Sequence, residues 1–313
     1  MSSCTGAVSG KRRGRRTVWF PACDDVGVPT EIDERWPGLG RLGEHRRLLE
    51  RAIARFREDA RVAGLVVGGS LAHGAADPYS DLDLYVIARD EAHDELFAER
   101  DAAAEAVGSP LFGFVVDPLP GGSIDHIVVY EGLVKFDFMY LKESDFEPAP
   151  KWAGCVVLKD ASGRVGSGVA RSEGLAPPRP SADELLELNQ KFWVWCWYVF
   201  GKILRGELWE ALDGIHGIRT LALVPMLDWA AERPQEGYRR LERKTDSEAV
   251  VRLEATVAGV EPDALHAALR AEIGLFRELR AVLFDRGGLA FDAKPEALLE
   301  SEMIRHWVAR GAQ

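Results

Sequence analysis

The chain has 313 residues, of which 47% are hydrophobic and 28% are charged, and its formal net charge is −11. This composition is typical of a soluble protein long enough for two domains, and no apolar run approaches the ~20 residues that a membrane-spanning helix needs. The negative charge argues against a long RNA or DNA substrate, because such binding depends on a basic surface. An acidic cleft would instead attract a small polycationic acceptor, although negative charge also simply keeps proteins soluble.

Residues 1–38 are rich in Gly, Arg, Ser and Pro, which predicts a flexible N-terminal extension. The basic run at residues 11–16 lacks the apolar stretch that follows it in an export signal, so we interpret it as a solvated tail. The cysteines show neither CxxC pairs nor zinc-ligand spacing, which favours free thiols in a reducing compartment, the cytoplasm. They are Cys4, Cys23, Cys155 and Cys196.

Residues 39–150 predict a small domain that mixes helices and strands. The domain begins with an amphipathic helix over Leu42–Val62. Strand-forming segments then follow along the chain, interrupted by a helix over Glu91–Val107. The expected strands are 64–67, 81–88, 111–116, 124–130 and 133–141. The turn Glu131-Gly132 joins the last two of these strands.

Residues 151–180 predict a Gly/Ser/Pro-rich connector, with an edge strand possible over 152–160. Ser181 and Glu184 then form a capping-box pattern that starts a helical domain over 181–313. The fold class is therefore α+β: a small mixed-sheet domain followed by an all-α bundle. The expected helices are 185–205, 208–231, one opened by residues 245–248, one from Pro262 to about Gly287, and one from Pro295.

The segment Gly68–Tyr85, GGSLAHGAADPYSDLDLY, carries the chemistry. Gly68, Gly69 and Ser70 follow a strand, and such a turn lets backbone N–H groups and a hydroxyl approach a phosphate. Asp81 and Asp83 are two residues apart in the next strand, so their side chains share a face. Two acids this close repel unless a cation lies between them, and Mg²⁺ typically binds one or two carboxylates together with substrate phosphates.

This Gly-Gly-Ser turn followed by Asp-x-Asp resembles the nucleotidyltransferase superfamily. The resemblance implies a polymerase-β-like catalytic domain in which Gly68, Gly69 and Ser70 hold a nucleotide triphosphate and the two aspartates hold catalytic Mg²⁺, two ions being expected. The superfamily also uses a third carboxylate from a later strand, which Asp137 supplies in the run VKFDFMY. In some relatives this carboxylate is the general base and in others a metal ligand, so both roles stay open.

The helical second half resembles the aminoglycoside and lincosamide adenylyltransferases, whose bundle helps to close over the acceptor. The resemblance suggests that Lys202 and Arg205 bind the nucleotide phosphates, although cations at a helix end also occur for purely local reasons. Trp193 and Trp197 share a face of the same helix, where we expect mainly a core role, with stacking on a base or sugar as the alternative.

The predicted function is Mg²⁺-dependent transfer of a nucleoside monophosphate, AMP from ATP or another triphosphate, to a hydroxyl of a small cationic molecule, with release of pyrophosphate. An antibiotic of the aminoglycoside or lincosamide type is the expected acceptor. Two alternatives are protein nucleotidylation of the toxin–antitoxin type and an inactive nucleotide-binding regulatory module. Neither the acceptor nor the nucleotide base can be identified from a motif, because loops and bundle residues build the acceptor pocket.

Overall fold

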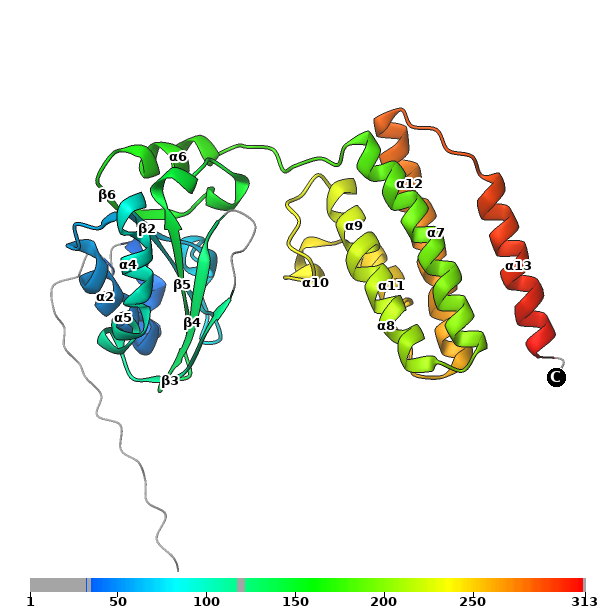
Figure 1. Ribbon diagram of the computed structural model, residues 1–313, viewed down its shortest axis with the longest axis horizontal. Coiled ribbons are helices and arrows are strands. Elements are labelled where there is room, and N and C mark those ends of the chain that lie inside the picture. Colours follow the sequence, from blue (N-terminus) through cyan, green and yellow to red (C-terminus); the bar gives the residue numbers. More distant parts are fainter. Residues whose placement is uncertain (1–31, 33–34, 117–121, 312–313) are drawn as a thin grey trace, which may run out of the picture. The chain divides into compact units, whose positions relative to one another are not determined.

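The computed structural model describes residue 32 and residues 35–116 and 122–311, and these divide into two compact units. The first comprises Met1–Phe146 and Cys155–Ser162, and the second comprises Glu147–Gly154 and Gly163–Gln313. Figure 1 shows a sheet with its helices in the first unit and a set of long helices in the second. The predicted extension, residues 1–38, lies almost entirely outside the described residues.

A six-stranded mixed sheet forms the first unit, with the strand order β3-β4-β5-β2-β1-β6. The β2 and β5 strands at its centre are parallel, and the other neighbouring pairs are antiparallel. The strands are β1 (Val62–Val67), β2 (Leu82–Ala88), β3 (Pro110–Val116), β4 (Ile124–Tyr130), β5 (Lys135–Lys142) and β6 (Val156–Asp160). The α+β prediction is thus confirmed, and the possible edge strand is present as β6.

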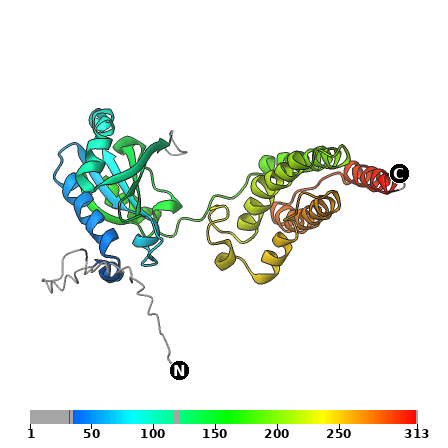
Figure 2. The same cartoon turned by 90° about the horizontal axis from the view of Figure 1, so that it is seen from below.

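Three helices cover one face of this sheet (Figures 1 and 2): α2 (Gly43–Arg57), α4 (His93–Ala98) and α5 (Arg100–Val107). Alternate residues of β2 and β5 enter the core beneath them, because neighbouring strand residues point to opposite faces. Phe136 and Phe138 stack there with ring centroids 4.2 Å apart. On the other face, the first residues of β2 and β5 are only half-buried and include Asp83 and Asp137, whereas Ile87, Met139 and Leu141 further along are buried.

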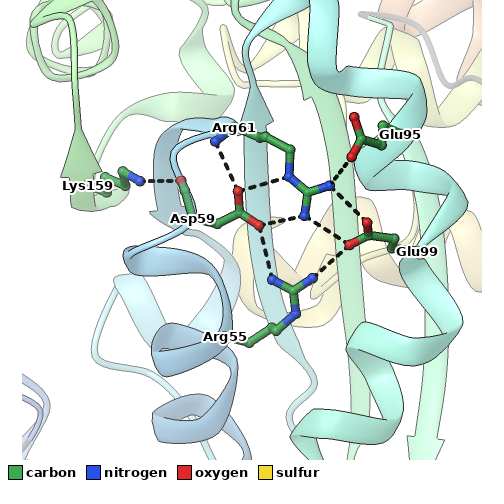
Figure 3. A network of polar contacts seen from close by, with 6 residues as sticks. All are labelled: Arg55, Asp59, Arg61, Glu95, Glu99 and Lys159. Atoms are coloured by element: carbon green, nitrogen blue, oxygen red, sulfur yellow. Dashed lines mark hydrogen bonds and ion pairs between the residues drawn. The ribbon is translucent and has the colours of Figure 1, made fainter.

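An ion-pair network anchors the covering helices to the sheet (Figure 3). The Arg61 guanidinium, just before β1, binds Asp59 and Glu99, with distances of 2.8 Å from Arg61 Nη2 to Asp59 Oδ2 and 2.9 Å from Arg61 Nη1 to Glu99 Oε1. Arg55 of α2 binds the same two carboxylates, and Glu95 of α4 also pairs with Arg61. Hydrogen bonds from Arg61 hold the pKa of Asp59 well below its usual range. The network therefore links α2, β1 and the junction of α4 with α5.

The second unit is helical and has its own apolar core. The Ser181 hydroxyl accepts from the Glu184 N–H, and the Glu184 carboxylate accepts from the Ser181 N–H, so the predicted capping box is confirmed. A buried ion pair between Arg280 and Glu296 fastens the last helix to the one before it. The helices are α6 (Arg164–Ser172), α7 (Ala182–Leu204), α8 (Leu208–Ile218), α9 (Val224–Ala230), α10 (Leu241–Lys244), α11 (Ser247–Glu254), α12 (Pro262–Gly287) and α13 (Lys294–Arg310).

Several predicted elements differ from the structure in detail. The connector contains helix α6, whose Val165 and Val169 are buried one turn apart although Gly and Ser surround them. The single helix expected over 208–231 is divided into α8 and α9 by a π-helical turn, Arg219–Leu223. This turn ends two residues before Pro225, which has no N–H to continue regular α-helical bonding.

The helix expected over 91–107 is likewise divided, into a short 3₁₀ turn (Asp90–Ala92), α4 and α5. The helix expected over 42–62 ends at Arg57, which leaves Asp59 and Arg61 in the turn that carries the ion pairs. Within the part of the chain that the structure describes, we find no helix with both the length and the apolar composition needed to cross a bilayer.

Candidate active site

The glycine turn lies against the acids. Gly69 begins the short helix α3 (Gly69–Ala72) with φ +62°, a conformation that favours glycine. A Cβ added to Gly69 would overlap the carboxylate of Asp83. The N–H of Gly68 donates to the backbone oxygen of Asp83 at 3.0 Å, so the turn is also tied to β2. Glycine is therefore required at position 69 for two independent reasons, its backbone conformation and its contact with an acid.

Asp81, Asp83 and Asp137 converge on one face of the sheet. Asp81 directly precedes β2, Asp83 is its second residue, and Asp137 lies beside Asp83 in the parallel register of β2 with β5. One carboxylate oxygen of each acid lies within 4.8 Å of those of the other two. The sequence placed the first two acids together by spacing alone, whereas only the strand register brings Asp137 beside them.

Lys135, to which the sequence analysis gave no role, joins this cluster. Its ammonium group lies 2.8 Å from Oδ2 of Asp81 and 2.5 Å from Oδ2 of Asp137. Burial alone would lower the pKa of Lys135, but hydrogen bonds to Asp137 and Asp81 outweigh this effect and raise it. The available signal was its position two residues before Asp137 on the same strand, which places both side chains on one face.

The hydroxyl of Ser70 is buried and has no hydrogen-bond partner among the described residues. Because an unsatisfied buried polar group is unfavourable, the position of Ser70 beside the glycine turn suits an added acceptor such as a phosphate oxygen. His73, at the end of the same turn, has its Nδ1 2.8 Å from the backbone oxygen of Gly69. That contact gives His73 a local structural role.

Lys202 and Arg205 belong to the helical unit, near the end of α7. The Lys202 ammonium lies 2.6 Å from Glu207 and 2.8 Å from Glu210, and these hydrogen bonds raise its pKa. Arg205 also binds Glu207 at 2.6 Å. Their expected role at the nucleotide phosphates stays a prediction, and that role would require these ion pairs to open.

The aromatic residues of α7 divide between core and surface. Trp193 is buried in the helical core, whereas Trp197 is 45% exposed. Both line a cavity of about 610 Å³ together with Phe291 and residues of α13. Neither the acids nor the glycine turn line this cavity. The acids and the turn therefore define the candidate site, and stacking of Trp193 or Trp197 on a base or sugar stays a prediction.

The acids are suited to a divalent cation. Three carboxylates supply the hard oxygen ligands that Mg²⁺ prefers, and the ammonium of Lys135 already holds a positive charge between two of them. The turn beside them has glycines, which let the backbone approach a phosphate closely, and the hydroxyl of Ser70, which can donate to one. A mixed sheet that brings a glycine turn against three acids is the arrangement expected of a nucleotidyltransferase.

Comparison with known proteins identifies the family. A family model described as streptomycin adenylyltransferase matches residues 44–297, so the chain belongs to that family and is an adenylyltransferase. No curated protein matches the chain. A crystal structure of an aminoglycoside 6-adenyltransferase from Bacillus subtilis is similar in fold, with 15% identity, a TM-score of 0.43, and coverage of 84% of this chain and 98% of that one.

Proposed function

We propose that the enzyme transfers AMP from ATP to a hydroxyl group of an aminoglycoside antibiotic and releases pyrophosphate. The observation that carries the proposal is the cluster of Asp81, Asp83 and Asp137 against the glycine turn, in a chain of the streptomycin adenylyltransferase family. Aminoglycosides are hydroxylated and cationic, which agrees with the net charge of −11. ATP as the donor would place the reaction in the cytoplasm.

In the proposed mechanism, Asp81, Asp83 and Asp137 hold Mg²⁺, and the turn from Gly68 to Ser70 holds the triphosphate. Bound Mg²⁺ would neutralise charge on the phosphate oxygens and help pyrophosphate to leave. The Ser70 hydroxyl would donate to a phosphate oxygen, and the closeness of Gly69 to Asp83 keeps the phosphates beside the acids. Asp137 acts as a metal ligand in this proposal, which is supported by its distance of at most 4.8 Å from the other two acids.

Apolar and aromatic side chains follow Asp137 on the same face of the sheet, and they suit an acceptor that contains rings. Asp137 pairs with Ile127 of β4, and Ile127 pairs with Phe114 of β3, so these side chains form one row across the sheet. A second row leads from Lys135 through Val129 to Phe112. Phe112 is 71% exposed and Phe114 is 59% exposed. This apolar strip begins at the acids and extends away from the glycine turn. An in-line reaction needs the acceptor on that side, opposite the pyrophosphate that leaves from the turn.

We therefore propose that a sugar ring of the aminoglycoside stacks on Phe112 and Phe114. Replacing both with Ser should raise the KM for the acceptor by about tenfold or more, because aromatic contacts with a bound ring contribute on the order of 1 kcal/mol each. The affinity for Mg-ATP should stay unchanged. Leu133→Ser, which removes a 78% exposed apolar side chain in the turn before β5, is the matched control. An unchanged KM in the double variant would remove the strip from the acceptor site.

The test of the whole proposal is pyrophosphate release from each nucleoside triphosphate with Mg²⁺ and a panel of acceptors, streptomycin first. Asp83→Asn should reduce turnover by about a hundredfold or more, as loss of one preorganised electrostatic group does in other enzymes. Its Mg²⁺ affinity should also fall. If no member of the panel is modified while labelled AMP appears on a protein, the acceptor assignment is wrong and protein nucleotidylation replaces it. If wild type releases no pyrophosphate and binds no nucleotide, the catalytic proposal falls.

Asp137→Asn distinguishes the two roles of the third acid. A metal ligand predicts weaker binding of Mg²⁺ together with lower turnover. A general base predicts unchanged Mg²⁺ binding with slow turnover, and that result would contradict the role proposed here.

A further inference from the structure

We propose that Lys135 is a built-in cation that occupies the metal position between Asp81 and Asp137 and is displaced when a divalent ion binds. The inference rests on the proposed metal site and goes beyond it, because it assigns a role to a residue outside the motif. Its basis is the pair of short contacts from one ammonium group to two of the three acids, 2.8 Å to Asp81 and 2.5 Å to Asp137.

The charges of the converging acids favour a shared cation. Like charges this close repel, and the repulsion is stronger near a protein interior than in water. The side chains of Asp81 and Asp137 are 26% and 16% exposed, so solvent screens them only in part. An ammonium group shared between them offsets the repulsion before any metal arrives. Lys135 thereby keeps two of the acids in their converging positions in the metal-free enzyme.

Lys135 and a divalent ion compete for one position. The ammonium group binds Oδ2 of both acids, so it lies between these two oxygens. A divalent ion that bridges the same two acids needs the same space, so it and the ammonium exclude each other. Three carboxylates attract a divalent ion more strongly than a single ammonium, and a lysine side chain is flexible enough to leave. Its side chain is already 40% exposed, which gives it a route toward solvent or toward an anionic phosphate.

A competing cation and a purely structural ion pair differ in their effect on metal binding. A surface pair contributes little to stability and has no effect on a metal site. A competing cation instead lowers the affinity of the free protein for metal and protects the free protein against unfolding. The two roles therefore predict different outcomes for the same substitution.

The experiment compares wild type with Lys135→Met, which keeps the apolar stem and removes the charge. Calorimetric titration of the nucleotide-free protein with Mn²⁺, and again with Mg²⁺, should show about tenfold tighter binding in the variant, within the range found when groups beside metal ligands are changed. Without metal, the Tm of Lys135→Met should be lower than that of wild type. At saturating Mn²⁺ this difference in Tm should disappear.

Two further variants serve as controls. Lys142→Met removes the same charge at the other end of β5, where successive positions place Lys142 on the opposite face from Lys135, and it should bind metal as wild type does. Lys135→Arg keeps the cation and should not tighten metal binding. Equal or weaker Mn²⁺ binding by Lys135→Met would overturn the inference, as would equal tightening in Lys142→Met. The metal site itself is tested separately by Asp83→Asn, since loss of Mn²⁺ binding there does not depend on Lys135.

Discussion

Two clusters of three carboxylates lie in the sheet unit and differ in how their charge is balanced. Around Arg61, the carboxylates of Asp59, Glu95 and Glu99 bind two guanidinium groups that form forked hydrogen bonds (Figure 3). At the candidate site, Asp81, Asp83 and Asp137 converge, and one ammonium group pairs with two of them among the described residues.

The difference separates stability from function. Arg provides several fixed donors that match carboxylates, so the Arg61 network joins helices to the sheet as a permanent connection. A single ammonium group on a flexible stem can leave the two acids that it pairs with, so a divalent ion can take its place. The same number of acids thus stabilises the fold in one place and forms a candidate metal site in the other.

The largest effect is expected at the candidate site, from a substitution that changes no charge. Gly69→Ala should reduce turnover by about a hundredfold or more, because its Cβ would push the Asp83 carboxylate out of position. Gly74→Ala is the control, since Gly74 also has a positive φ, +66°, but has nothing within 4 Å of an added Cβ. Both variants should lose roughly 1 to 2 kcal/mol of unfolding free energy through backbone strain. Equal turnover in the two variants would show that the contact with Asp83 is unimportant.

A smaller effect is expected at the Arg61 network, and it should appear in stability alone. Asp59→Asn should lower the free energy of unfolding at pH 7 by about 2 to 3 kcal/mol, because it removes charged hydrogen bonds to Arg61 and Arg55. Turnover per folded molecule should not change. Glu50→Gln, which weakens a half-buried i,i+4 pair with Arg46 on α2, should cost about 0.5 kcal/mol or less.

The stabilisation of the folded state by Asp59 should depend on pH. Its pKa in the folded protein lies below that in the unfolded chain, so its stabilisation is present above about pH 4 and is lost as the pH falls further. Chemical unfolding from pH 7 to pH 3 should therefore show the stability difference between wild type and Asp59→Asn narrowing at the acid end without closing, because the pKa of Asp59 in the folded protein lies lower still. A stability difference that is the same at every pH would contradict this account.

The smallest expected effect concerns an acid that no described cation binds directly. Glu272 of α12 is fully buried, neither of its carboxylate oxygens has a hydrogen-bond partner among the described residues, and burial raises its pKa well above the usual value. Glu272→Met should raise the free energy of unfolding by about 1 kcal/mol at neutral pH, since it removes an unsatisfied buried group.

The folded state binds the Glu272 proton more tightly than the unfolded chain, so wild-type stability should decrease as the pH rises from about 4.5. The advantage of Glu272→Met should therefore grow with pH, and below pH 4 it should fall to the smaller gain from removing a neutral carboxyl group without a hydrogen-bond partner among the described residues. Glu272→Gln should remove the pH dependence while keeping an unsatisfied polar group. A destabilised Glu272→Met protein would show that the carboxyl group has a partner that balances its burial.

Much of the fold follows from local patterns in the chain. Strand alternation, the glycine turn and the capping box at Ser181 each depend on residues close in sequence, and each is found in the structure at or near its predicted place. The break between α8 and α9 depends on how Pro225 is accommodated within a packed helix, and periodicity alone did not reveal it. Helix α6 escaped prediction because two buried valines, and not its Gly-rich composition, decide its conformation.

The candidate site divides in the same way. The sequence by itself determined that Gly68, Gly69 and Ser70 form a turn and that Asp81 and Asp83 share a face, because the turn and the two-residue period of a strand are local properties. Only the tertiary structure decided that Gly69 lies against Asp83, that Asp137 lies beside Asp83, and that Lys135 bridges two acids. It also placed Phe114 in the same row as Asp137. The physical reason is strand register, which depends on the packing of the whole sheet and which no short stretch of sequence specifies.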